Sequence, residues 1–378
     1  MITIKFGGII FDKIIDLSNI INILNHYENK NIFLVISAFG KTSQLLKNAI
    51  NHSLSGELNK SLNIINDLKT FYYDKLNKNK INNKEYFNKI EYYFDKLENL
   101  MRGVYLTSEC SDKTWANILS YGEIISSKII YLFLLENYTK EILWIDATKF
   151  MVTNHAFINA EPEINKTKLK FEKLLGDNLL EGNIPKIIIS QGFIGANDDE
   201  ETTTMGFESS NLSACLIGYI TKSEKILFVS DVEGVRTCDP KYFKFDKLIK
   251  KLNYKNSKLL GVLGVKLLYP SMIEFIEKYS LEIEFHSYNN FKENYTIVYD
   301  TKMQKDYKLD NLIIIVKESK GEIILYNASF NNLSDIIADS YFQKTIDNIS
   351  YQAETIIILL SFPIDLNLVC NKLENIIN

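Results

Sequence analysis

The sequence predicts an α/β protein with a three-layer, mostly parallel sheet, followed by a small α+β domain. Up to about residue 300, short apolar strands alternate with helical stretches, which is typical of a parallel sheet covered by helices on both faces. After about residue 310, strands and helices follow one another closely, as in a compact α+β unit. The chain has 378 residues, of which 46% are hydrophobic and 24% charged, so it is long enough for both domains.

The first domain, placed at residues 1–300, begins with two strands of different pattern. Residues 1–6 alternate apolar and polar side chains before a glycine pair, whereas residues 31–37 form a nearly continuous apolar run. The polar stretch 43–105 is expected to be a helical subregion whose charged faces are solvated. The other expected elements are a helix around 115–137, strands at 141–146 and 186–195, a helix from Asn211, a strand at 225–231, a helix around 259–279, and strands at 281–287 and 295–300.

The second domain is placed at residues 310–378, after a boundary near 300–310. Apolar segments separated by turn residues predict a small sheet with helices packed on it. The expected strands are 312–318, 321–327 and 355–362, and the expected helices are 332–346 and 365–377.

The composition argues against several classes of partner. Lysine and arginine total 43 against 47 aspartate and glutamate residues, and a net charge of −4 provides no basic field for nucleic acid or a membrane surface. The four cysteines form no CxxC pair and the four histidines do not cluster, which argues against disulfides and a metal site. The chain begins with a strand pattern, and we expect none of its apolar runs to span a bilayer. We therefore expect a cytoplasmic protein.

Polar residues at the ends of the first two strands are candidates for ligand binding. Lys5 lies just before Gly7 and Gly8, and a cation beside exposed backbone amides can bind phosphate. A lysine before a glycine turn is, however, more often plain architecture. Ser37 and Thr42 follow the second strand, where they either line a hydroxyl-rich pocket or cap the next helix.

Further candidates lie later in the chain. Glu123 stands inside an apolar helical segment, so if it is buried it needs hydrogen-bond donors or a cation such as a substrate ammonium. A surface glutamate on an amphipathic helix explains this segment equally well. Ser230 and Asp231 end a buried strand and are followed by a glycine loop, an arrangement that suits a nucleoside. Lys266 is a second isolated lysine, at the start of an apolar helix.

The segment TTTMGFESSNLSA, residues 202–214, runs from three threonines through a turn into a helix start. Backbone amides at a helix start suit an anion. The segment has no lysine or arginine, however, and Glu208 adds a negative charge. Its own residues therefore leave the nature of its ligand open.

The order of the motifs is more informative than any one of them. KFGG, SAFGKTSQLL, LSYGEIIS, IDATKFMVTN with NAEP, QGFIG with TTTMG, DVEGVRTCDP and LGVKLLYPSMIE follow one another along the chain. Over roughly residues 2–290 the sequence thus resembles aspartokinase, of the amino acid kinase superfamily. The resemblance implies transfer of the γ-phosphoryl group of ATP to the side-chain carboxylate of aspartate, on the route to lysine, threonine and methionine. It also implies a Mg²⁺ ion bridging the phosphates, and a homodimer formed by ACT modules that pair edge to edge.

The resemblance assigns a role to each motif residue. Lys5 and Lys266 would flank the transferring phosphoryl group, and Asn211 stands where the family has an aspartate that orients these lysines. The substrate would contact Ser37 and Thr42 with its reacting carboxylate and Glu123 with its ammonium, and Phe207 and Ser210 belong to the same substrate loop. The residues implied to hold the nucleotide are Lys5, Gly7, Gly8, Ser230, Asp231, Arg236, Lys241 and Lys266.

The sequence departs from the family pattern at several positions. Phe207 stands where the family has an arginine for the substrate α-carboxylate, and losing that contact costs roughly 2–5 kcal/mol of binding if nothing replaces it. Asn211 replaces an aspartate, and Ile9 and Ile10 replace two hydroxyl residues. Residues 310–378 have room for about one ACT-like module where the family usually has two. The glycine-containing effector loop is not evident either, which argues against feedback inhibition by lysine or threonine.

Three functions therefore stay open. The first is an active aspartate kinase with a remodelled substrate loop, which the retained lysines, Thr42 and Glu123 favour. The second is a kinase for another carboxylate, because Phe207 suits an apolar or neutral group. The third is a non-catalytic protein that binds a nucleotide or an amino acid as a partner or sensor, since a fold alone does not fix a function.

Overall fold

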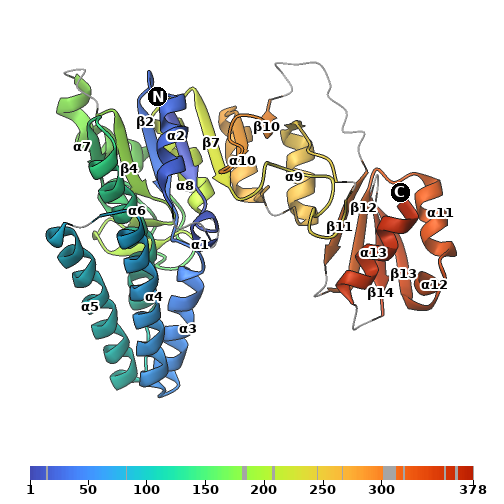
Figure 1. The fold of residues 1–378 in the computed structure, drawn as a ribbon, viewed down its shortest axis with the longest axis horizontal. Helices are drawn as coiled ribbons and strands as arrows, with labels where there is room; N and C mark the ends of the chain where they lie inside the picture. The colour runs from blue at the N-terminus through green and yellow to red at the C-terminus, as the bar shows by residue number, and fades with distance from the viewer. Residues whose placement is uncertain are drawn as a thin grey trace. The chain divides into compact units, whose positions relative to one another are not determined.

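The computed structural model divides by its contacts into two compact units (Figure 1). The first comprises Met1–Val232 with His286–Phe291, and the second comprises Glu233–Phe285 with Lys292–Asn378. The structure describes residues 1–13, 16–81, 83–180, 185–206, 209–244, 246–265, 267–300, 312–317, 320–352, 355–361 and 365–377. Of the predicted boundary near 300–310, residues 301–310 lie outside these described residues.

A parallel sheet forms the centre of the first unit. Its strands lie in the order β3-β4-β2-β1-β7, and each neighbouring pair is parallel. Every residue of β2 and β4 is buried, which explains the apolar run of β2 and the three isoleucines that begin β4. The prediction of a mostly parallel α/β sheet is confirmed. The strands are β1 (Ile2–Phe6), β2 (Ile32–Ile36), β3 (Ile142–Trp144), β4 (Ile187–Gln191) and β7 (Lys225–Ser230), and β9 (Ile283–Ser287) is divided between the units.

The helical subregion predicted at 43–105 consists of three long helices, α3, α4 and α5, that pack with one another and with α6 (Figure 1). Each buries one apolar face; on α4 the buried residues recur at helical spacing from Ile65 to Leu76. The helices of this unit are α1 (Ile10–Lys13), α2 (Ser18–His26), α3 (Thr42–Leu54), α4 (Leu58–Lys78), α5 (Lys84–Thr107), α6 (Asp112–Asn137), α7 (Ile164–Leu180) and α8 (Ser209–Ile220), with a 3-10 turn, η1, at Ala147–Lys149.

Helix α6 corrects one expectation from the sequence. Among the described helices it is the one long and apolar enough to cross a membrane, with a mean hydropathy of 1.5 in its most apolar window. Of that window, 72% is buried inside the fold, and α6 packs against β2, β3 and β4. We expected no apolar run long enough to span a bilayer, whereas α6 is long and largely apolar because the sheet and the neighbouring helices cover it.

The strand predicted at 186–195 is two strands, because the chain turns after Gln191. Phe193 has a φ of 68°, in the left-handed region, and this breaks the extended run. The second piece, β5 (Ile194–Ala196), forms an antiparallel hairpin with β6 (Thr202–Thr204).

In the second unit, the single helix predicted at 259–279 is two helices. The first, α9 (Tyr254–Leu263), ends at Gly264, whose φ of 112° favours glycine, and the second, α10 (Pro270–Tyr279), begins at a proline. Two short strands, β8 (Lys251–Asn253) and β10 (Tyr295–Tyr299), pair in parallel.

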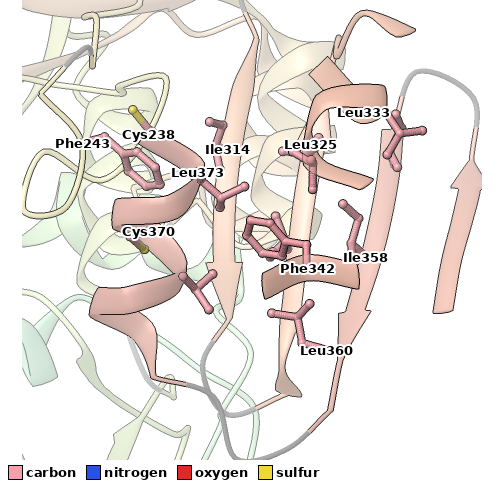
Figure 2. Packing of buried hydrophobic residues seen from close by; sticks show 14 residues of the cluster. Cys238, Phe243, Ile314, Leu325, Leu333, Phe342, Ile358, Leu360, Cys370 and Leu373 are labelled. Atoms are coloured by element: carbon pink, nitrogen blue, oxygen red, sulfur yellow. The ribbon is translucent and has the colours of Figure 1, made fainter. Parts of the chain in front are cut away.

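The predicted α+β module is confirmed as a four-stranded antiparallel sheet in the order β11-β12-β14-β13 with helices on it (Figure 1). Strand β13 was not predicted, and the helix expected at 332–346 is two helices that meet at Asp339, whose side chain caps the second. Figure 2 shows the apolar core of this module. Its elements are β11 (Ile313–Lys317), β12 (Glu322–Tyr326), α11 (Phe330–Ala338), α12 (Ser340–Thr345), β13 (Ile346–Gln352), β14 (Thr355–Leu360) and α13 (Leu366–Ile377).

Candidate active site

Three chain segments of the first unit meet at Ala38, just after β2. A Cβ atom on Gly8 would lie 1.9 Å from the carbonyl oxygen of Ala38, and one on Gly122 would lie 3.0 Å from the Ala38 Cβ. Only glycine allows the turn after β1 and the middle of α6 to approach so closely. The amide of Gly40 donates to the Gly8 carbonyl at 2.7 Å, which ties the two strand-end loops together.

Lys5 of β1 has its cation beside Gly7, the first residue of the glycine pair. Its Nζ lies 3.7 Å from the position that a Cβ on Gly7 would occupy. The Gly7 amide donates to the carbonyl of Val229 at 2.9 Å, so it would have to leave Val229 to donate to a phosphate. Of the two isoleucines after the pair, Ile10 is buried in the core and Ile9 is 47% exposed.

Glu123 is buried, with 3% of its side chain exposed. Its carboxylate accepts from the Ala38 amide, but Oε2 has no partner among the described residues. Burial raises the pKa of Glu123 to about 8, because few donors replace the lost water. The Oγ of Ser37, next to Ala38 in the chain, is likewise buried and unpartnered within the described part of the chain. The surface-glutamate alternative is therefore wrong, and two orphaned polar groups flank one residue.

Thr42 sits in a buried hydrogen-bond network that the sequence did not reveal. Its Oγ1 donates to the carbonyl of Phe39 at 2.6 Å and lies 3.0 Å from the hydroxyl of Tyr72. Tyr72 also lies 2.8 Å from the Oγ of Ser126, which donates to Gly122. The Thr42 proton is thus committed to Phe39, and binding a carboxylate would require this hydroxyl to rotate.

Lys75 is a second residue that the sequence did not single out. It is 1% exposed, and its Nζ donates to the carbonyl of Phe11 at 2.5 Å. Burial lowers the pKa of Lys75 to about 8, against the attraction of Asp12 and Asp74. Lys75 therefore fastens α4 to the segment that follows the glycine pair. The helical spacing of α4 places Tyr72 and Lys75 on its buried face, and this was the sequence feature that could have identified them.

The segment predicted to bind the substrate leads into α8, whose first residues are buried. Ser210 packs on Gly192, where a Cβ would lie 2.7 Å from the Ser210 Cβ, and Asn211 is 7% exposed. Two of the preceding threonines form hydrogen bonds within the fold. Thr203 Oγ1 lies 2.7 Å from Thr153 Oγ1, and the Thr204 amide donates to the carbonyl of Phe157. Phe207 lies outside the described residues.

Ser230 and Asp231 are two further predicted nucleotide residues of the first unit, at the end of β7. The Ser230 hydroxyl donates to the carbonyl of Val232 and accepts from the Val232 amide. The backbone carbonyl of Ser230 accepts from the Tyr288 amide. Asp231 is exposed at the carboxyl end of β7. Mg²⁺ typically takes one or two carboxylates and completes its shell with phosphates and water, so Asp231 fits as a ligand. Among the described residues no group of three or more His, Cys, Asp or Glu gathers as a metal site.

Arg236 and Lys241 belong to the second unit, and both cations are held locally. Arg236 forms ion pairs with Glu233 and Asp246. Lys241 Nζ donates to the hydroxyl of Tyr242 at 3.0 Å. Lys266 lies outside the described residues, so its predicted place beside the phosphoryl group stays a prediction.

Comparison with known proteins agrees with these motifs. The sequence profile described as the amino acid kinase family matches residues 1–285. The bifunctional aspartokinase/homoserine dehydrogenase of Buchnera aphidicola is 24% identical over 342 residues, covering 88% of this chain and 40% of the relative. The aspartokinase of Chlamydia pneumoniae is 32% identical over 165 residues, covering 44% and 36%. Escherichia coli aspartokinase III, solved with aspartate and ADP, superposes with a TM-score of 0.72 at 20% identity, over 96% of this chain and 79% of that one. The chain thus spans two fifths or less of the length of these two curated relatives.

Proposed function

The chain belongs to the amino acid kinase family, and we propose on that premise that it phosphorylates the side-chain carboxylate of L-aspartate with ATP. The products are 4-phospho-L-aspartate and ADP. The observation that carries this proposal is the pair of buried, unpartnered groups beside Ala38, Ser37 Oγ and Glu123 Oε2, within the described part of the chain. The similar E. coli enzyme was solved with aspartate and ADP, which supports the same acceptor here.

The chemistry of the two groups fits an amino acid. A buried carboxylate is stabilised by a cation, and the ammonium of aspartate supplies both the charge and the hydrogen-bond donors that Oε2 lacks. The Ser37 hydroxyl donates to a carboxylate oxygen, and Thr42 joins it after its hydroxyl rotates away from Phe39. Ser210 and Asn211 lie at the start of α8, where backbone amides favour the second carboxylate.

In the reaction a carboxylate oxygen of the acceptor attacks the γ-phosphorus, and the bond from that phosphorus to the bridging oxygen of ADP breaks. Lys5 neutralises charge on the transferring group, as does Lys266 by resemblance. We assign Gly8, Ser230, Asp231, Arg236 and Lys241 to the nucleotide, as the family resemblance implies. When bound, Mg²⁺ neutralises phosphate charge, and the exposed carboxylate of Asp231 would hold it.

Several further assignments rest on the relatives. A cytoplasmic location fits metabolic kinases of this kind and the burial of α6 inside the fold. A place in lysine formation fits the similarity to the lysine-sensitive aspartokinase 3 of E. coli. We also retain a homodimer, a kinase domain at 1–300 and an ACT-like domain at 310–378 as proposals.

Trapping of the acyl phosphate tests the function. The purified chain is incubated with ATP, Mg²⁺, hydroxylamine and, in turn, L-aspartate, L-glutamate, succinate and β-alanine. Aspartyl hydroxamate at a turnover of about 1–100 per second supports the proposal. Hydroxamate from another acid alone would establish a kinase for a different carboxylate. Binding of ATP without any turnover would establish a non-catalytic nucleotide-binding protein.

A further inference from the structure

The segment that carries Arg236 and Lys241 is anchored in the core of the C-terminal module. Two of its side chains, Cys238 and Phe243, are 6% and 2% exposed. They pack with residues of the module's strands and helices, including Ile314 and Leu373 (Figure 2). An aromatic side chain buried to this extent fixes the backbone that carries it.

Hydrogen bonds to backbone groups hold the segment at both ends. The amide of Ile314 in β11 donates to the carbonyl of Thr237 at 2.8 Å, and the amide of Lys244 donates to the carboxylate of Glu374 in α13. Between these two ties the chain makes a tight turn at Asp239, whose side chain accepts from the Lys241 amide at 2.9 Å and whose carbonyl accepts from Phe243 at 3.1 Å.

The consequence for the exposed residues of the turn is direct. Asp239 and Lys241 are exposed at the tip, while Cys238 and Phe243 on either side are buried in the module. The module therefore sets the conformation of the tip. The tip loses this conformation when the packing of Phe243 in the module core is disrupted.

We propose that the C-terminal module positions the nucleotide-binding segment, with Phe243 and Cys238 as the positioning residues and Glu374 as the outer tie. This inference rests on the proposed binding of ATP by Arg236 and Lys241. The module then contributes to ATP affinity in the absence of any effector. Loss of the module therefore weakens nucleotide binding. It leaves the proposed acceptor site beside Ala38, in the other unit, unchanged.

The test compares two phenylalanines of the same core in the full chain. Phe243→Leu is expected to raise the dissociation constant of MgATP, measured by calorimetry, about tenfold or more. Phe342→Leu makes the same change at a residue that is 0% exposed in this core but lies on α12, away from the segment. It is expected to change the dissociation constant less than twofold. Trypsin should also cut after Lys241 and Lys244 faster in Phe243→Leu than in Phe342→Leu.

A second pair of variants avoids the core. Glu374→Ala removes the acceptor for the Lys244 amide and is expected to raise the dissociation constant of MgATP at least threefold. Glu374→Gln keeps an acceptor oxygen and is expected to bind MgATP like the unaltered chain. Equal MgATP affinity in Phe243→Leu, Phe342→Leu and the unaltered chain overturns the inference and leaves the proposed function intact. Failure of the unaltered chain to bind MgATP overturns both.

Discussion

The hydroxyl of Tyr72 lies 3.0 Å from Oγ1 of Thr42, and both side chains are buried. Tyr72 is on α4, inside the stretch whose charge pattern predicts solvated helices, and Thr42 begins α3 next to the proposed acceptor site. Through this contact the helical subregion is joined to the start of α3, beside the proposed acceptor site.

Tyr72→Phe tests whether the hydrogen bonds around Tyr72 support the proposed acceptor site. The change keeps the ring but leaves the oxygens of Thr42 and Ser126 without the hydroxyl. We expect a loss of about 1–3 kcal/mol in the free energy of unfolding and at least a fivefold rise in the KM for aspartate. The KM for ATP should stay constant. Tyr73→Phe is the matched control, because its hydroxyl bonds Glu91 outside the site; equal effects of the two changes would contradict the assignment.

Lys5→Met tests the phosphoryl end of the site. Removing a cation from the transferring group is expected to lower kcat by about 10³-fold or more, with the far-ultraviolet circular dichroism unchanged. The control is Lys30→Met, which removes a surface ion pair with Glu224 and should leave kcat within twofold. Retention of normal kcat in Lys5→Met would place the reaction elsewhere.

The substrate loop offers a gain-of-function test. Phe207→Arg with Asn211→Asp restores the arginine and the carboxylate of the family pattern. A charge-assisted contact to the α-carboxylate is expected to raise kcat/KM for aspartate at least tenfold. Turnover is measured by hydroxamate formation, with Phe207→Leu as the control for loss of the ring alone. If the double change lowers kcat/KM, the alignment of this loop is wrong.

The sequence predicted the main architecture because apolar strand runs alternate with helical stretches over most of the first domain. Parallel β2 is apolar along its whole length and β4 begins with three isoleucines, and the C-terminal strands β11, β12 and β14 are bounded by clear turns. The family match and the similar aspartokinase fold confirm the resemblance drawn from the motifs. Helix α7 was missed because it carries many lysines. Strand β13 was missed because its sequence contains many polar residues, as suits an edge strand of its sheet.

The site was predictable only where it lies on motif residues. Ser37, Thr42 and Glu123 come from strand-end and helix motifs that converge on Ala38. The sequence did not identify Tyr72 and Lys75, because their role depends on how α4 packs against the segments after β1 and β2. Helical spacing marks them as buried, but only the docked structure identifies their partners.

The most direct test of the account is the pH dependence of aspartate binding, because Glu123 is proposed to receive the substrate ammonium. Burial raises the pKa of Glu123 to about 8, so below that pH the carboxyl is mostly protonated and must lose its proton to pair with the ammonium. The KM for aspartate is therefore expected to fall about tenfold per pH unit as pH rises toward 8, and to level off above it.

The measurement is the KM for L-aspartate from pH 6 to 9, in the unaltered chain and in Glu123→Gln. A sloped profile with a bend near pH 8 in the unaltered chain, and a high, flat profile in Glu123→Gln, is the predicted result. A flat profile in both, or an unchanged KM in Glu123→Gln, would contradict the assignment of Glu123 as the acceptor's ammonium site.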